Sequence, residues 1–237
     1  MTKHRAHGSP EHYQSRVYKM LRVWQKKLLM NNNPIEAEFT TKGRHNILLR
    51  PNLYELWLVG GGAGGSGCLR IGGWGYAMGG TGGYLHVRFR VHKTTTATII
   101  VGDGGDSAVK QNAEASGVSG EDSAIEGIEN VSIIAGGGRR SKTAPDGSYG
   151  WRITFGLGGA NTLLGVEEIL ENNPNGRPQS PSATGQGTGT PRIATYEPNS
   201  NYSADPTKGC GGDIGWSGNT GTTTKGGVGY AKIKSID

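Results

Sequence analysis

The alternation of apolar and polar positions predicts that the chain after residue 34 consists mainly of β-strands. Residues 84–91 alternate strictly, as expected for a strand with one face buried. Residues 94–101 are rich in β-branched side chains, which suit a pleated surface. Six more segments have strand-like patterns and turn residues at their ends. They are 37–40, 46–49, 53–59, 131–135, 151–155 and 229–234.

The first 34 residues follow a helical period instead. Ser9 and Pro10 are typical of a helix start, and apolar residues then recur every three or four positions as far as Leu28. Asn31 to Pro34 ends the pattern. We expect an amphipathic helix of about twenty residues, and we assign 1–34 as a basic helical arm and 35–237 as a second domain.

The charge of the chain is concentrated in this arm. Residues 1–30 contain seven of the 25 Lys and Arg residues and only one of the 19 Asp and Glu residues, so the net charge of +6 comes from the arm. The rest of the chain contains equal numbers of basic and acidic residues, so it lacks the excess of positive charge that is typical of a nucleic-acid-binding protein. The basic face of this helix could be exposed to solvent, or it could dock on an acidic partner surface or on a neighbouring virion protein. Its candidate attachment residues are Arg16, Lys19, Trp24, Lys26 and Lys27.

Glycine supplies 43 of the 237 residues, far above its usual share of about 7%. Its tracts, 60–67, 72–83, 136–138, 156–159 and 209–229, interrupt the strand pattern, and three of them directly extend a predicted strand. Glycine gives a sheet no side chain to pack, but backbones without Cβ atoms approach closely enough to bond to one another. We therefore expect packed polyglycine helices, and flexible linkers are the alternative.

Five aromatic residues lie within or beside the glycine tracts. They fit two roles: packing between glycine segments, or display at loop tips as recognition anchors. Both roles predict damage on substitution, and only the first predicts a loss of folding. The five candidate receptor-binding residues are Trp74, Tyr76, Tyr149, Trp151 and Trp216.

Residues 161–208 have the composition of an insertion. We expect a short helical piece around Leu163 to Glu171, and then a long proline-rich surface loop.

Motifs for catalysis, metal binding and cofactor binding are weak. Residues 60–65 satisfy G-x-G-x-x-G, but more glycine follows instead of a helix, and 56–102 contain no Asp or Glu, so a dinucleotide site is excluded. In 102–107 a hairpin turn is favoured over a calcium site. His86 and His92 are interpreted as exposed strand residues. We expect no catalytic residues, no metal and no cofactor.

Cysteine and hydropathy patterns add little to this picture. Cys68 and Cys210 are far apart in the chain, which favours free buried thiols over a single bridge. No apolar run has the length of a membrane span or the position of a secretory signal. We therefore expect no membrane insertion.

A series of short motifs resembles the glycine-rich domain of phage tail fibres and tail-tip adhesins. Each motif has low complexity, but their order matches throughout residues 36–236. In chain order they are Glu38-Phe39-Thr40-Thr41-Lys42-Gly43, a strand ending in Val59-Gly60-Gly61-Gly62, Gly82-Gly83-Tyr84, Val101-Gly102-Asp103-Gly104-Gly105, Ala135-Gly136-Gly137-Gly138 and Gly226-Gly227-Val228-Gly229.

The resemblance implies a mainly β fold, namely an antiparallel β-sandwich with inserted polyglycine II-like segments, here preceded by one amphipathic α-helix. It implies a virion protein, which would be made in the host cytoplasm. The basic N-terminal helix is not part of the family pattern, and our own hypothesis is that it anchors a non-enzymatic chain to other virion proteins. The partner at the other end would be a host receptor, either a glycan or an outer-membrane protein, and a homo-oligomer such as a trimer is expected. The alternative is a structural virion component, such as a capsid decoration, head fibre or tail adaptor. An enzyme that acts on surface polysaccharide has no local motif in its favour.

Overall fold

The computed structural model describes residues 34–70, 73–147, 150–154, 156–174, 214–217, 220–223 and 225–236. The chain separates into two units, Met1–Ile35 and Glu36–Asp237. The helix expected in the first unit lies outside the described residues. The described residues of the second unit form strands and contain no helix, so this part of the chain is mainly β.

One antiparallel sheet has five strands and contains both ends of the second unit. Its order is β1 (Glu36–Phe39), β18 (Tyr230–Ile236), β3 (Asn52–Val59), β6 (Tyr84–Val91) and β15 (Glu168–Asn173). The central strand β3 pairs along its whole length with β6, and from Leu53 to Val59 with β18.

A second antiparallel sheet also has five strands. Its order is β14 (Asn161–Leu164), β11 (Ser132–Ala135), β10 (Ser123–Glu126), β7 (Thr95–Val101) and β2 (Gly43–Leu49).

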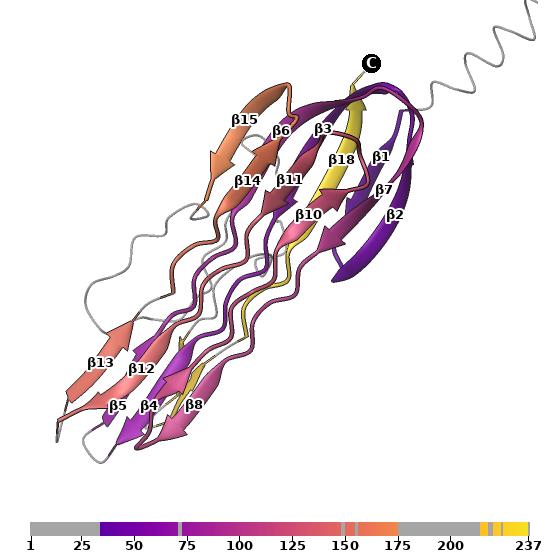
Figure 1. Cartoon of the computed structure of the whole chain (residues 1–237). Helices are drawn as coiled ribbons and strands as arrows, with labels where there is room; N and C mark the ends of the chain where they lie inside the picture. Colours follow the sequence, from indigo (N-terminus) through magenta and orange to yellow (C-terminus); the bar gives the residue numbers. More distant parts are fainter. Residues whose placement is uncertain are drawn as a thin grey trace, which may run out of the picture. The chain divides into compact units, whose positions relative to one another are not determined.

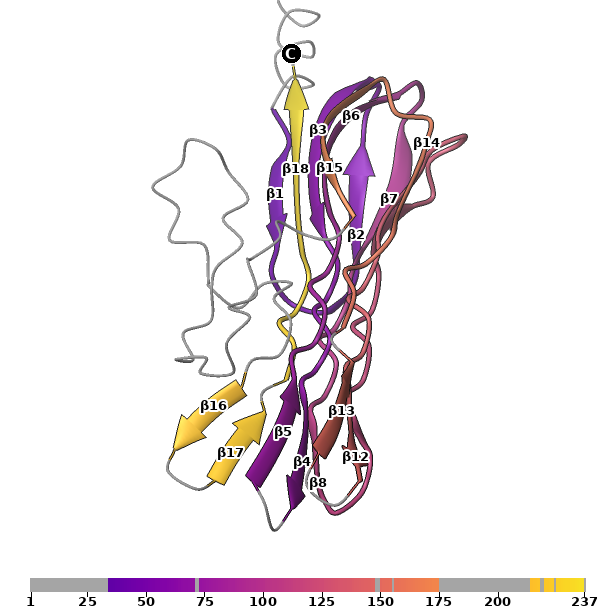
Figure 2. The same ribbon diagram turned by 90° about the vertical axis from the view of Figure 1, so that its left-hand side faces the viewer.

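The apolar rows of these two sheets are buried. In β6 the predicted alternation is confirmed, with Leu85, Val87, Phe89 and Val91 buried and Arg90 exposed. Strand β3 contacts β10 and β11, and β18 contacts β7, so the two sheets meet through their apolar faces. They lie beside each other at one end of the second unit, which we call the five-stranded end (Figure 2).

Eight shorter strands form the opposite end of the second unit, which we call the hairpin end (Figure 1). β4 (Ser66–Arg70) pairs antiparallel with β5 (Gly73–Ala77) and parallel with β8 (Ala108–Gln111). β12 (Lys142–Asp146) pairs with β13 (Gly150–Thr154) and with β9 (Ala115–Ser116). β16 (Ile214–Ser217) pairs with β17 (Thr220–Thr223).

Extended glycine-rich segments connect the two ends side by side (Figures 1 and 2). We call them together the glycine array. Its described segments are 60–65, 79–83, 102–107, 117–122, 136–141, 156–160 and 225–229.

Segment 60–65 lies at the centre of the array and is completely buried. Its successive amides donate hydrogen bonds of 2.8 to 2.9 Å to three neighbouring segments in turn. A repeat of three residues is the period of an extended three-residue-per-turn chain. The donors and acceptors are Gly60 and Ala63 to Gly83 and Gly80, Gly61 and Gly64 to Glu121 and Val118, and Gly62 to Gly227.

The neighbouring segments also bond to one another and back to the centre. Segment 117–122 donates to Asp103 and Gly138, and the amides of Gly105 and Gly138 donate to carbonyls of the central segment. The array is therefore a network of main-chain hydrogen bonds, as the glycine composition predicts, and not a set of loose linkers.

The structure corrects two expectations about local structure. Residues 163–171 are not helical, because they contribute to β14 and β15, the edge strands of the two large sheets. Residues 102–107 are not a hairpin turn, because they form a segment of the array that leads from β7 to β8. The remainder of the expected loop, from residue 175 to 208, lies outside the described residues.

Candidate functional site: the hairpin end

Three hairpins reverse direction at the hairpin end. The chain turns back between Arg70 and Gly73, between Asp146 and Gly150, and between Ser217 and Thr220. Because β17 contacts β4 and β8, and β13 contacts β5, the three hairpins form one cluster. Figure 2 shows them together at the end opposite to β1 and to the C-terminus.

Four of the five aromatic positions singled out in the sequence belong to these hairpins. Trp74 and Tyr76 are on β5, Trp151 is on β13 and Trp216 is on β16. Tyr149 falls between β12 and β13, outside the described residues. The fold thus brings to one end residues that are far apart in the chain.

The two aromatic side chains that the structure describes at this end are partly buried. The ring of Trp151 lies directly over Gly75, so a Cβ at residue 75 would overlap it. The Trp151 indole N–H is buried and has no hydrogen-bond partner among the described residues. Burial raises the pKa of the Tyr76 hydroxyl. Trp151 and Tyr76 therefore contribute packing between hairpins.

A buried cluster of hydroxyl groups connects the hairpin end to the array. Ser141 Oγ lies 3.0 Å from Ser66 Oγ and 3.3 Å from the carbonyl oxygen of Gly64. Ser66 Oγ is also 3.1 Å from Thr143 Oγ1. All three side chains are fully buried, and the cluster fixes the start of β4 against β12.

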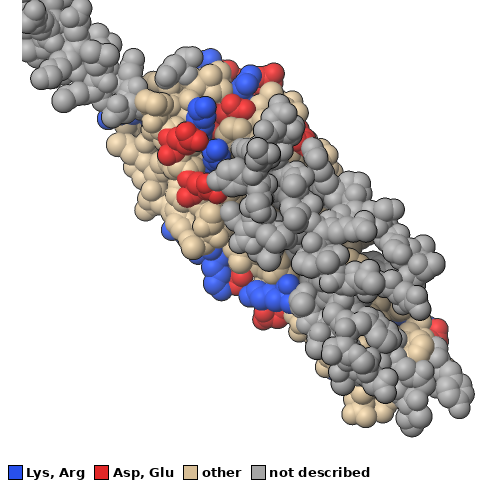
Figure 3. All heavy atoms as spheres, turned by 180° about the vertical axis from the view of Figure 1, so that it is seen from behind, with Lys and Arg blue, Asp and Glu red and all other residues tan. Residues whose placement is uncertain are grey.

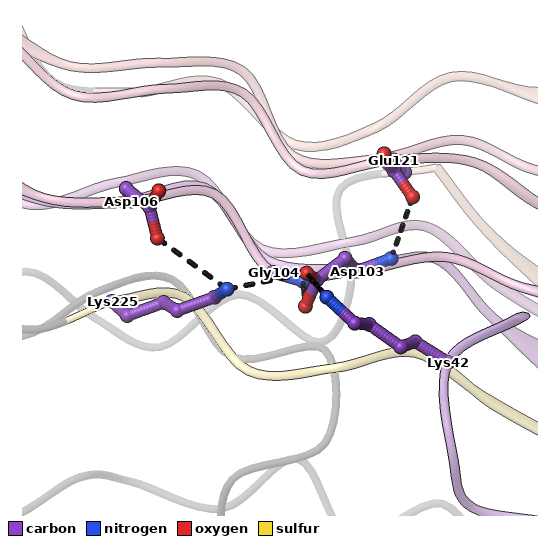
Figure 4. A network of polar contacts seen from close by, with 6 residues as sticks. All are labelled: Lys42, Asp103, Gly104, Asp106, Glu121 and Lys225. Atoms are coloured by element: carbon purple, nitrogen blue, oxygen red, sulfur yellow. Dashed lines mark hydrogen bonds and ion pairs between the residues drawn. The ribbon is translucent and has the colours of Figure 1, made fainter.

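An ionic cluster missed by the sequence analysis joins the array to the five-stranded end (Figure 4). Asp103 Oδ2 accepts from Lys42 at 2.5 Å and from Lys225 at 3.2 Å, and Lys225 lies 3.4 Å from Asp106. The hydrogen bond from Lys42, together with Lys225 and the Gly104 amide, holds the pKa of Asp103 below its usual value. These residues are widely separated in sequence, so only the folded chain reveals the cluster.

Two histidines of the five-stranded end contact aromatic rings. His86 is not an exposed strand residue: its ring stacks on Trp57, and its Nε2 lies 2.5 Å from Glu55 Oε1. The register of β3 and β6 places these three side chains on one face. His45 packs against Phe39. His92 is exposed, as expected.

Basic and acidic side chains are interspersed on the surface. Arg88 and Arg90 form ion pairs with Glu168 and Glu167, and the face in Figure 3 shows blue and red groups side by side. The described residues visible on this face form no continuous basic stripe of the kind that binds nucleic acid. The arm residues Arg16, Lys19, Trp24, Lys26 and Lys27 lie outside the described residues.

The described residues have few features of a chemical site. They contain no group of His, Cys, Asp and Glu side chains arranged to hold a metal ion, and Cys68 is a buried free thiol. None of their elements is a helix with the length and apolarity of a membrane span.

Comparison with known protein families identifies the kind of domain that the chain contains. A family model described as a glycine-rich domain matches residues 40–235, which include the array and the strands of both large sheets except β1 and the last residue of β18. No curated protein sequence matches the chain.

Proposed function

Because the chain belongs to the glycine-rich domain family, we propose that it is a non-enzymatic virion protein of the phage tail-fibre or receptor-binding type. In this proposal the N-terminal helix of residues 1–34 anchors the chain to other virion proteins. The hairpin end meets the host surface, where a glycan or an outer-membrane protein is the receptor, and the chain forms a homo-oligomer.

The observation that carries the proposal is the position of the hairpins relative to β1. The second unit begins at β1 on one end, and its three hairpins cluster on the other (Figure 2). The hydrogen-bonded array connects the two ends and supports the described strands of the hairpins. Rigid scaffolds that carry clustered loops are well suited to recognition, because little conformational entropy is lost on binding.

The same proposal includes a finer description of the fold. We interpret the two five-stranded sheets as a β-sandwich and the array as packed polyglycine II helices. The buried apolar rows and the three-residue repeat of hydrogen bonds support this description.

The proposal is tested by measuring whether the purified chain binds to cells of a bacterial strain that the phage infects. Tyr149→Ser, between β12 and β13 in the sequence, should weaken binding, because it removes one of the candidate receptor-binding side chains. His92→Ser, in the turn between β6 and β7 at the five-stranded end, is the matched control and should bind normally. A chain that neither binds these cells nor competes with infection would contradict the receptor role.

A structural virion component is the second candidate, and one observation favours it. Tyr76 and Trp151 pack inside the hairpin end instead of standing free at loop tips, as expected for a module that only stabilises a particle. A reconstruction of the intact particle separates the two functions. Hairpin loops enclosed by neighbouring subunits would support the structural role and exclude the receptor role.

A further inference from the structure

A surface groove with a volume of about 290 Å³ lies along the side of the array, away from the three hairpin reversals. Its floor is the main chain of Gly120, Gly136 and Gly137, and Ala160 lies beside it. A Cβ on any of these three glycines would point into the array and overlap a neighbouring carbonyl oxygen, so it is their main chain that faces the groove. The polar side chains that line the groove are Ser119, Asp122, Arg139 and Thr162.

The main-chain amides beside this groove are already occupied. The Gly137 N–H donates to Asp122 Oδ1 at 2.7 Å, and the Arg140 N–H donates to Ser119 Oγ at 3.1 Å. Donors and acceptors are both three residues apart, which is the repeat of the array. An extended peptide could pair with these amides only by displacing both side chains, so the groove is poorly suited to an additional peptide strand.

The same hydrogen bonds orient the side chains of the groove for a different ligand. Asp122 is held through one carboxylate oxygen and has a second oxygen that can accept hydrogen bonds. Ser119 accepts from an amide, so its hydroxyl hydrogen can be donated to a ligand. Two groups are therefore fixed in place before a ligand arrives, which lowers the cost of binding.

The charges of the groove favour a ligand without net charge. An anion would meet the Asp122 carboxylate, and a cation would meet the Arg139 guanidinium. Both side chains are exposed, and neither forms an ion pair with another described residue. The ligand should therefore be neutral and should carry many groups that both donate and accept hydrogen bonds.

From these features we propose that the groove binds a neutral saccharide. Sugar hydroxyls can donate hydrogen bonds to the Asp122 carboxylate, accept them from the Arg139 guanidinium, and do either with the hydroxyls of Ser119 and Thr162. The carbon face of the sugar ring can lie on the glycine main chain of the floor. None of the described residues that line the groove is aromatic, so its affinity for a single sugar ring should be weak, with a Kd of about 1 mM. The proposal deepens the proposed function and rests on it for its biological meaning, because it gives a host glycan a second contact.

Titrating the ¹⁵N-labelled full chain with galactose, glucose and N-acetylglucosamine, and recording its amide spectra, tests the groove directly. At least one sugar should shift the amides of 119–122, 136–140 and 160–162 in a saturable way. Asp122→Asn keeps an oxygen that can accept from Gly137, and it should weaken binding about tenfold. Arg139→Ala should have a similar effect, and its neighbour Arg140→Ala, outside the groove lining, should bind like the parent chain. The unchanged positions of all other amides show that each variant is folded.

Several results would overturn the proposal. These are no shift with any of the three sugars, shifts that are equal in the Arg139 and Arg140 variants, or stronger binding of glucuronic acid, glucosamine or triglycine at the same residues. The outcome is separable from that of the cell-binding assay. A chain that binds cells but no sugar loses only the groove, and a chain that binds sugar but no cells loses only the receptor role.

Discussion

Glycine is required for different reasons in turns and in the array: in turns because of the backbone conformation, and in the array because there is no space for a Cβ atom. Gly147 and Gly165 have φ of 61° and 71°, a backbone conformation that other residues rarely adopt. No array glycine has a φ in this range. What excludes a side chain there is space, because a Cβ at Gly61 would overlap the carbonyl oxygen of Asp103, and a Cβ at Gly82 would overlap that of Gly60.

This difference predicts a large cost for a single methyl group in the array. Gly61→Ala should destabilise the chain by about 2 to 4 kcal/mol, because backbone must move to admit the methyl group. Ala63→Gly in the same segment is the matched control. It removes a methyl group that the array already accommodates, and it should cost about 1 kcal/mol or less. Urea unfolding measures both values, and equal costs would show that close packing does not set the requirement for glycine.

The Asp103 cluster predicts a dependence of stability on pH. Its folded pKa is lowered below the ordinary value of 3.8, first by the hydrogen bond from Lys42, so the ionised carboxylate stabilises the fold at neutral pH. This contribution is complete above the unfolded pKa and disappears as pH falls through the lower, folded pKa.

Asp103→Asn should therefore cost about 1 to 2 kcal/mol at neutral pH, and the difference should close in acid. Asp106→Asn is the control, because Asp106 is more exposed and contacts only Lys225 in this cluster. Thermal unfolding of the three proteins, from neutral pH down to a pH below the folded pKa of Asp103, measures the effect. A gap that persists unchanged in acid would contradict the assigned role of the carboxylate.

At the scale of elements, the transition from glycine segment to strand depends on the buried hydroxyl cluster. Ser141 ends segment 136–141 and contacts both Ser66, the first residue of β4, and the carbonyl of Gly64. Removing a buried partner leaves the remaining groups without a hydrogen bond, which is costly in a low-dielectric interior.

Ser141→Ala should lower the free energy of unfolding by about 1 to 3 kcal/mol and should loosen β4 and β12 more than the large sheets. Ser116→Ala is the control, since its hydroxyl is only partly buried and makes longer contacts of 3.3 and 3.5 Å. Hydrogen exchange resolved by residue reports both effects. Equal protection of β4 in the two variants would exclude this role for the cluster.

Some strands of the fold could be predicted from the sequence and others could not. Strands with regular alternation, such as β6, were found with their buried face, because burial on one face imposes a period of two. Strands β4 and β5 were missed, because Gly67, Gly73 and Gly75 remove that period. Residues 163–171 were assigned to a helix, although pairing with β11 and β6 makes them strands.

For the candidate site, the sequence identified residues but not their surroundings. The aromatic positions were found from their setting among glycines, and their placement on three hairpins of one end required the fold. The Asp103 cluster and the groove have no local signal, because partners such as Lys42 and Lys225 are separated by most of the chain.

At the scale of the second unit, main-chain bonds take the place of a hydrophobic core between the two ends. The five-stranded end has a core of ordinary apolar packing, while the array is held by amide-to-carbonyl bonds between glycine segments. These bonds connect the described strands of the hairpin end to the five-stranded end, and they add to the packing of Tyr76 and Trp151 between the hairpins. The proposed receptor role depends on the rigidity of this connection.

Hydrogen–deuterium exchange of the assembled chain tests the rigidity of the array most directly. The amides of 60–64, which lie at the centre and donate in three directions, should exchange as slowly as those of β3 and β6. Amides of 105, 120 and 138 should also be protected. Exchange of 60–64 at the rate of an unstructured peptide, with β3 still protected, would show that the segments are tethers and that the hairpins are not held in place.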